Sequence, residues 1–356
     1  MLASVSVNLK VNCLERGARS LRNRRSQELR WCWGATSHLT HEMITGNKAP
    51  EKHFPKPDES SLAKSAELST GLNWFPVKPE PFLTVRIQDL SETPTLTGLC
   101  VGYERSEWRA SQFVDHVMEW LPEFALNHTE LSALHSGNTV KLVRAAARKV
   151  YESNKFKKRG EFGELFLHAA IRQVFGSLPA ISKIYYKSAF NNTVKGFDAV
   201  HVVGPANDME LWLGEAKFYS NFNRAVRDVV TELQKHTTTN YLRGEFLLIR
   251  GKIDPNWPHA QALHALLNDN RSLDEVFSRV CLPVLLTYDS KCLGSFSKCD
   301  QLYQNAFAQE ILANHLIFKN QKLPKEIRIH LILLPLSTKA KLIDLLDKKL
   351  KLWQLL

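Results

Sequence analysis

The sequence predicts an α/β protein in which a mixed β-sheet is flanked by helices, with a smaller N-terminal α/β unit ahead of it. After residue 160, helical and strand patterns follow in the order α-β-β-β-α-β, and further α/β units continue along the chain. The composition agrees with this class, because 44% hydrophobic and 23% charged residues over 356 positions are typical of globular chains with a substantial core.

Residues 1–70 are expected to form a poorly ordered arm followed by a linker. The first forty or so positions are rich in Arg and Ser and lack a strand or helix period. The stretch that follows is polar and carries Pro50, Pro55 and Pro57. A second interpretation of the start is upstream sequence included by an early start codon, with Met43 as a later candidate start.

Residues 71–155 form the predicted N-terminal unit. Its strands alternate polar and apolar side chains, and its helices place apolar side chains at helical spacing. The predicted elements are strands over Phe82–Gln88 and Leu96–Tyr103, a helix that Ser106 or Ser111 caps and that ends near Leu126, and a helix over Thr139–Asn154.

Residues 156–356 form the predicted larger domain. Its helices carry apolar stripes of helical period, whereas its strands are short runs that alternate or are wholly apolar, the last of which stops at Pro335. The predicted helices are Glu161–Phe175, Asn223–Leu242, Pro258–Leu267, Gln301–Phe318 and Lys339–Leu355, and the predicted strands are Ile181–Ser188, Gly196–Val203, Met209–Lys217, Glu245–Arg250, Leu282–Tyr288 and Ile327–Leu334.

Charge, cysteine content and hydropathy limit the possible partners and locations. The net charge of +11 permits a nucleic-acid partner without establishing one. No apolar stretch approaches the ~20 residues that a membrane-spanning helix needs, so no membrane contact is expected. The six cysteines have no C-x-x-C spacing, and we therefore expect no zinc site and a reducing, cytoplasmic setting.

The strand over 209–217 carries the first candidate chemistry. Leu211, Leu213, Glu215 and Lys217 share one face, because side chains alternate along a strand. The apolar members indicate that this face is buried, and burial of a carboxylate and an ammonium is costly unless a partner or a function compensates it.

The preceding strand brings a second carboxylate to the same place. A short turn over residues 204–208 joins the two strands, which predicts an antiparallel hairpin with Asp198 near Glu215. Like charges in close approach repel each other, and a divalent cation removes that repulsion. Oxygen ligands favour a hard ion, so Mg²⁺ is expected and Mn²⁺ is possible.

A third carboxylate is expected from the helix over 161–175. On a helical wheel Glu164 falls beside the apolar stripe, whereas Glu161 falls on the polar side with His168 and Arg172. We therefore predict that Glu164 points inward and that Glu161 is a first-turn carboxylate favoured by the helix dipole.

A D…E-x-K pattern alone is weak evidence, because surface ion pairs explain most short strands that end in Glu and Lys. Three features favour a site here: the buried phase of both strands, the short hairpin turn between them, and the half-buried glutamate upstream. Together these residues, in the order helix-Glu, strand-Asp, strand-Glu-x-Lys, resemble the PD-(D/E)xK nuclease superfamily.

The run GEFGE…KGFD…LWLGEAKFY is similar to the HamA family, the nuclease subunits of the Hachiman anti-phage defence system. The resemblance covers about residues 150–350 and implies a restriction-endonuclease-like core. One departure is that Phe197 stands where the superfamily's name has proline before the aspartate.

The resemblance implies a metal-dependent DNase effector of a two-component system, which hydrolyses DNA phosphodiesters when a superfamily-2-type helicase subunit (HamB-like) releases it. Asp198 and Glu215 would hold Mg²⁺, and Glu164 would complete the shell directly or through water. Lys217 would position the attacking water or help to deprotonate it, and would stabilise charge on the phosphate.

Several basic and aromatic side chains are candidates for DNA contacts. A basic cluster just before the Glu164 helix is either a phosphate contact or a solvated turn, and the helix after the E-x-K strand is expected to face DNA. The candidates are Lys155, Lys157, Lys158 and Arg159 in the cluster, and Arg224, Arg227 and Gln234 on the helix. Tyr219 and Phe222 either stack on bases or, the stronger interpretation, pack in the core. His201 is not expected to be a ligand, and His236 is expected on the surface.

Two other functions stay open. The chain could be a non-catalytic DNA- or partner-binding subunit that retains the nuclease fold, which would bind no metal. It could also be a restriction or repair nuclease of the same superfamily, which would share the site and differ in partner.

Overall fold

The computed structural model describes residues 78–91, 93–150, 160–181 and 196–356. The chain divides into two units, Met1–Ala66 and Glu67–Leu356, and all described residues belong to the second. The predicted arm and linker over residues 1–70 lie outside these ranges.

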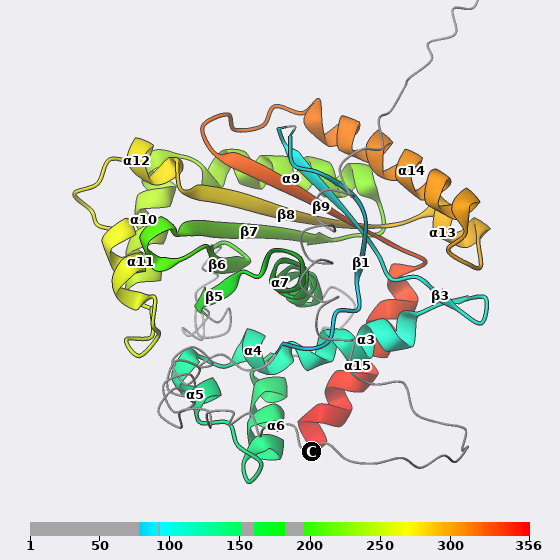
Figure 1. Cartoon of the computed structure of the whole chain (residues 1–356), viewed down its shortest axis with the longest axis horizontal. Coiled ribbons are helices and arrows are strands. Elements are labelled where there is room, and N and C mark those ends of the chain that lie inside the picture. Colours follow the sequence, from blue (N-terminus) through cyan, green and yellow to red (C-terminus); the bar gives the residue numbers. More distant parts are fainter. Residues whose placement is uncertain (1–77, 92, 151–159, 182–195) are drawn as a thin grey trace, which may run out of the picture. The chain divides into compact units, whose positions relative to one another are not determined.

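A mixed β-sheet forms the centre of the second unit, as the sequence predicts (Figure 1). Within the described residues it has seven strands in the order β1-β2-β9-β8-β7-β6-β5. The neighbours from β2 to β7 run parallel, whereas β1, β6 and β5 are added by antiparallel pairing. The strands are β1 (Thr84–Asp89), β2 (Thr95–Cys100), β5 (Leu178–Ile181), β6 (Ala199–Val203), β7 (Glu210–Phe218), β8 (Val280–Asp289) and β9 (Arg328–Leu336).

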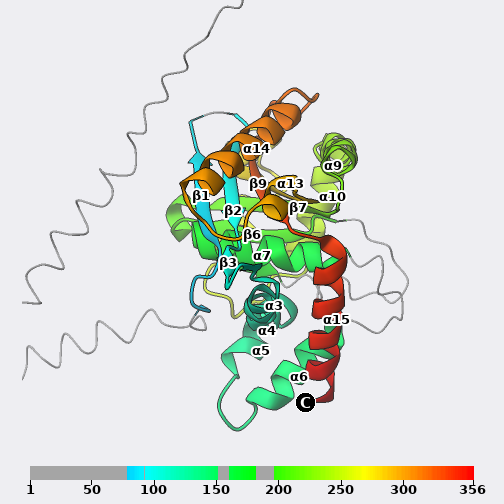
Figure 2. The ribbon, with the colours of Figure 1, turned by 90° about the vertical axis from the view of Figure 1, so that its right-hand side faces the viewer.

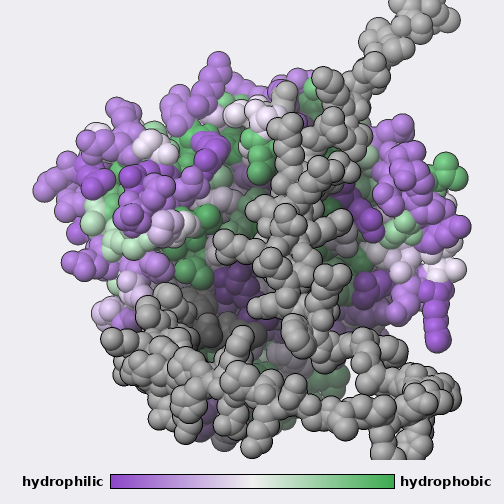
Figure 3. Space-filling model, in the orientation of Figure 1, coloured by the Kyte–Doolittle hydropathy of each residue, from purple (hydrophilic) through white to green (hydrophobic). Residues whose placement is uncertain are grey.

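Helices cover both faces of this sheet. Helices α9 and α14 pack on one face and α7 on the other (Figures 1 and 2). Helix α7 is in turn covered by α3 and α4, and α15 packs against α3 and α6. On the face shown in Figure 3 the visible side chains are mainly hydrophilic, with hydrophobic ones in smaller groups between them. The helices are α3 (Ala110–Glu119), α4 (Leu121–Ala125), α5 (His128–Ser132), α6 (Thr139–Val150), α7 (Glu161–Phe175), α9 (Phe222–His236), α10 (Thr239–Arg250), α11 (Ala260–Leu266), α12 (Leu273–Phe277), α13 (Lys291–Ser295), α14 (Gln301–Lys319) and α15 (Lys339–Leu355).

Most predicted elements are present, with boundaries that move by a few residues. Helix α7 and helix α15 have the predicted bounds. The helix expected to run to Leu126 is broken between α3 and α4, and the helix expected to run to Leu242 ends at His236. Most of the strand predicted over Ile181–Ser188 lies outside the described residues.

The predicted strand Glu245–Arg250 is wrong, because these residues belong to helix α10. Glu245, Phe246 and Ile249 are buried, whereas Leu247 and Leu248 are 61% and 43% exposed. This is the burial pattern of one helical face, and a short apolar run cannot distinguish a strand from such a helix by itself.

The last predicted strand continues through proline. Pro335 pairs with Tyr288 of β8, whereas pairing with β2 on the other side ends at Leu333. The missing amide hydrogen of Pro335 therefore falls where no neighbour requires it, which is the position that proline tolerates in a sheet.

The front part of the chain shares the central sheet. Residues 71–155 were expected to form a separate accessory unit, but β2 pairs with β9 in parallel and β1 extends the same sheet. Thr95 and Thr97 bind the two ring nitrogens of His330 at 2.5 and 2.9 Å. The partner of β2 lies more than two hundred residues further along the chain, where no local pattern reports it.

Candidate functional site

The hairpin of β6 and β7 brings the residues Asp198 and Glu215 next to each other across the sheet. The strands pair antiparallel with Ala199 opposite Gly214, so the next step of the ladder brings Asp198 beside Glu215. The Asp198 amide donates to the Gly214 carbonyl at 2.7 Å, and its Oδ2 atom accepts the Ala216 amide at 2.9 Å. The predicted hairpin is confirmed, and the aspartate is held by backbone groups of β7.

Two glycines let helix α7 approach the E-x-K strand closely. A Cβ atom on Gly214 would lie 2.7 Å from Cδ2 of Leu167, and one on Gly163 would lie 2.9 Å from Cβ of Phe218. A Cβ atom at either position would force its neighbours to shift, so glycine permits the close approach of the helix to the strand. This contact sets Glu164, one residue after Gly163, at the end of β7.

A pocket of about 600 Å³ lies where β7 ends. Glu164 of α7, Asp198 immediately before β6 and Lys217 of β7 line one part of it. Tyr219, Arg224 and Lys339 are among the residues that line the remainder. The carboxyl ends of parallel strands are the usual place for ligands in open α/β sheets, and the pocket follows that rule. Three of the four predicted site residues are thus brought together.

Glu215, the fourth, does not line the pocket. It is 2% exposed, and its Oε1 atom lies 2.5 Å from Nδ1 of His236 on helix α9. Burial lowers the pKa of His236 to about 4, so the neutral ring donates its Nδ1 hydrogen to the carboxylate. Tyr241 stacks on the same ring at 4.3 Å between centroids. The predicted surface position of His236 is therefore wrong.

Lys217 is also engaged by helix α9. Its Nζ atom binds a carboxylate oxygen of Glu232, one helical turn before His236. Burial alone would lower the pKa of Lys217, but the negative charges of Glu215, Glu232 and Asp198 outweigh it and raise that pKa. Lys217 therefore stays an ammonium at neutral pH.

Glu232 and His236, which contact the E-x-K pair, were not among the predicted site residues. One signal was available for the histidine. It follows Leu233 by three positions and Val229 by seven, which places it in the buried stripe of α9. A polar side chain in that phase requires a hydrogen-bonding partner, and the nearest strand offers the carboxylate of Glu215.

The donor set of the pocket suits a hard divalent cation. Among the described residues, no three His, Cys, Asp or Glu side chains are grouped so that they could hold a metal ion. Mg²⁺, however, is commonly bound by one or two carboxylates together with waters and substrate phosphates. Glu164 and Asp198, both half-buried on the wall of an open pocket, supply such a pair.

The predicted DNA contacts are only partly brought to this pocket. Arg224 lines it, whereas Arg227 and Gln234 do not. The Arg227 guanidinium lies 3.2 Å from Asp228, and the Gln234 side chain donates to the Lys322 carbonyl at 2.9 Å. Phe222 is buried, as the core-packing interpretation expected. The basic cluster Lys155, Lys157, Lys158 and Arg159 lies outside the described residues.

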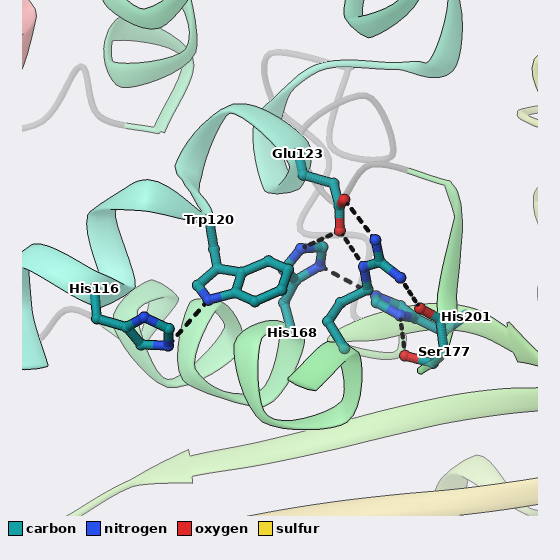
Figure 4. A network of polar contacts seen from close by, with 7 residues as sticks. His116, Trp120, Glu123, His168, Ser177 and His201 are labelled. Carbon is teal, nitrogen blue, oxygen red and sulfur yellow. Dashed lines mark hydrogen bonds and ion pairs between the residues drawn. The ribbon is translucent and has the colours of Figure 1, made fainter. Parts of the chain in front are cut away.

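A second group of chemistry-bearing side chains is fully buried between α4, α7 and β6 (Figure 4). Arg172 binds both carboxylate oxygens of Glu123, at 2.5 and 2.9 Å. His168 contacts Glu123 at 3.1 Å and His201 at 3.2 Å, and the Ser177 hydroxyl contacts His201 at 2.9 Å.

This buried network is structural in character. Burial lowers the pKa values of His168 and His201, so both rings are neutral and can pass hydrogen bonds from Ser177 to Glu123. The cavity beside it holds about 10 Å³, which is room for roughly one water molecule. The network therefore fixes α4 against the helix that carries Glu164.

Within the described ranges, every helix is too short or too polar to cross a lipid bilayer.

Comparison with known proteins identifies two similarities. The model of the HamA family matches residues 79–350. "Anti-bacteriophage protein A" of Escherichia coli (strain K12) is 25% identical over 268 residues, which cover 70% of this chain and 46% of that protein. The chain therefore spans about half the length of this curated relative.

Proposed function

The chain belongs to the HamA family, and we propose that it is an anti-phage defence protein that hydrolyses DNA phosphodiesters with the help of a divalent metal ion. In this proposal a superfamily-2-type helicase subunit is its partner and releases its activity. The name of the bacterial relative, which describes an anti-bacteriophage protein, supports the defence role.

The observation that carries the catalytic part is the pocket at the end of β7. It combines two carboxylates, Glu164 and Asp198, with the ammonium of Lys217. Phosphodiester hydrolysis needs these groups, because the attacking water must be activated and the charge that develops on the phosphate must be stabilised.

The chain's own residues divide the work as follows. Asp198 and Glu164 would hold Mg²⁺, which when bound supplies a more acidic water and polarises the phosphoryl oxygen. The Asp198 carboxylate is pre-aligned by the Ala216 amide at 2.9 Å. Because Lys217 is charged, it binds and stabilises the phosphate rather than removing a proton from water.

Helix α9 keeps the E-x-K pair in place. Glu232 holds the Lys217 ammonium at the pocket wall, and His236 holds Glu215 behind it. Glu215 in this arrangement acts on Lys217 through its negative charge, which is the largest contribution that raises the pKa of that lysine. We therefore assign Glu232 and His236 as positioning residues.

The proposal is tested with the purified full chain, alone and with its helicase partner, on supercoiled plasmid. We expect degradation in Mg²⁺ and none in EDTA. Intact plasmid in Mg²⁺, with and without the partner and with a chain that is folded by circular dichroism, would count against a nuclease.

The alternative of a non-catalytic binding subunit is favoured by one observation, the burial of Glu215 against His236. It predicts no heat of Mg²⁺ binding in calorimetry and normal phage protection by an Asp198→Asn variant. A restriction or repair nuclease would cut without the helicase partner. Loss of phage protection in the Asp198→Asn variant would exclude the non-catalytic binding subunit.

A further inference from the structure

A pair of cations lies in the pocket beyond the carboxylates. Arg224 sits in the first turn of α9, and Lys339 is the first residue of α15. Both line the cavity that Glu164 and Asp198 also line. The two cations come from helices more than a hundred residues apart in the sequence, so only the fold brings them together.

Tyr219 supports both cations with its ring. The Arg224 guanidinium lies 5.4 Å and the Lys339 ammonium 5.6 Å from the ring centroid. These are cation–π distances. The contacts of this ring are therefore with cations, which argues against Tyr219 as a platform on which a nucleic-acid base stacks.

Lys339 is held rigidly and is not neutralised. Its Nζ atom donates to the Phe218 carbonyl at 2.5 Å and lies 4.7 Å from the Phe218 ring centroid. Its backbone amide donates to Oδ1 of Asp289 at 2.7 Å. No carboxylate of the described residues forms an ion pair with its ammonium, and the nearest acid to Arg224 is Asp228 at 3.7 Å.

The surroundings of Lys339 destabilise its positive charge, so a bound anion would stabilise it. Burial lowers its pKa, the neighbouring charge of Arg224 lowers it further, and Asp289 opposes both. A desolvated cation beside a second cation is stabilised by any anion that bridges the two. A phosphate group has the charge and the several acceptor oxygens to do so.

We propose that Lys339 and Arg224 form a phosphate subsite that binds the backbone of a DNA strand next to the reacting phosphate. Its place beside Glu164 and Asp198 rests on the proposed nuclease function. Contacts to backbone phosphates position a strand without reading its bases. We therefore expect the subsite to bind DNA of any base sequence.

The test is binding of fluorescent DNA oligonucleotides of several sequences to the full chain in EDTA, over a series of salt concentrations. We expect Lys339→Ala and Arg224→Ala each to weaken binding by roughly three- to tenfold, equally for every sequence. Each should also reduce the slope of log K against log salt by about 0.9, the value for one lost phosphate contact.

Lys235→Ala is the matched control. Lys235 is an exposed cation on the same helix and does not line the pocket, so its variant should keep the affinity and slope of the wild type. Lys339→Arg should retain binding because it keeps the charge. Lys339→Ala could fail to fold because it loses the Phe218 contact. In that case Arg224→Ala tests the subsite alone, since Arg224 is 66% exposed and its replacement should leave the fold intact.

Two outcomes would overturn the subsite: wild-type binding by both alanine variants, or a loss confined to one base sequence. Plasmid cleavage in Mg²⁺ is read separately. A chain that shows the slope changes and does not cut refutes the nuclease and leaves the subsite standing. A chain that cuts, and whose two variants bind normally, refutes the subsite alone.

Discussion

Glu215 and His236 form a buried pair in which the carboxylate Oε1 and the ring Nδ1 are 2.5 Å apart. The carboxylate of the E-x-K strand is thus turned toward helix α9 and away from the pocket that Lys217 lines. The pair explains why an ionisable side chain can occupy the apolar face of β7, since its hydrogen bond compensates its burial.

Removal of this partner should destabilise the fold. His236→Ala removes a hydrogen-bond donor from the buried Glu215 carboxylate, and we expect a loss of about 1–3 kcal/mol in the free energy of unfolding. Urea unfolding followed by circular dichroism measures it. The control is His264→Ala, because His264 is exposed on α11. Equal stability of the two variants would show that the pair contributes nothing.

The Lys217–Glu232 contact should set the pH range of the proposed cleavage. Lys217→Met is expected to lose at least about a hundredfold in rate, because the phosphate loses its nearest cation. Glu232→Gln removes one charge that raises the Lys217 pKa, so its activity should decline at a lower alkaline pH than that of the wild type.

Cleavage rates measured from pH 7 to pH 11 test this, with Glu326→Gln as a control at an exposed acid outside the pocket. Identical alkaline limbs for Glu232→Gln and the wild type would exclude the proposed role of Glu232.

The Glu123–Arg172 ion pair should be needed for stability. Arg172→Met leaves Glu123 buried without its main cation, which costs about 3–5 kcal/mol. The double variant with Glu123→Gln should be less unstable than the sum of the single variants predicts, because no charge remains unpaired. Chemical unfolding of the wild type, the two single variants and the double variant gives the coupling energy between Glu123 and Arg172. Losses of stability that simply add in the double variant would contradict this prediction.

Acid should destabilise the protein through its buried histidines. Burial lowers the pKa of His116, His236 and His330 to about 4, and also lowers those of His168 and His201. The unfolded chain binds protons at these rings below about pH 6.5, whereas the folded chain does not. Stability is therefore full above that pH and falls as the pH decreases toward 4.

Thermal unfolding at pH 7, 6 and 5 measures this effect, and Tm should decrease at each step. The lowered pKa of Glu123 removes further stability only at more acidic pH, near and below about 4.3. A Tm that is constant or rises between pH 7 and pH 5 would contradict neutral, buried histidines.

The sequence predicted the part of the site that depends on local periodicity. Alternation along β6 and β7 and the short turn between them placed Asp198 beside Glu215, and the helical wheel placed Glu164 inward. Gly163 and Gly214 were visible in the same motifs, but only the structure shows the close contact between α7 and β7 that requires them.

Long-range partners could not be predicted. The pairing of β2 with β9, the approach of Lys339 to Phe218 and the bond between His236 and Glu215 join segments that no local pattern connects. The prediction of a strand at Glu245–Arg250 failed because Leu247 and Leu248 are exposed on a helix, and a short apolar run carries no sign of its period.

The most direct test of the account is the rate of Mg²⁺-dependent plasmid cleavage by Asp198→Asn, measured with the helicase partner present. The control is Asp208→Asn, since Asp208 lies at the turn of the same hairpin and is 84% exposed. We expect that Asp208→Asn cuts like the wild type and that Asp198→Asn, folded to the same Tm, does not cut. Wild-type cleavage by Asp198→Asn would contradict it.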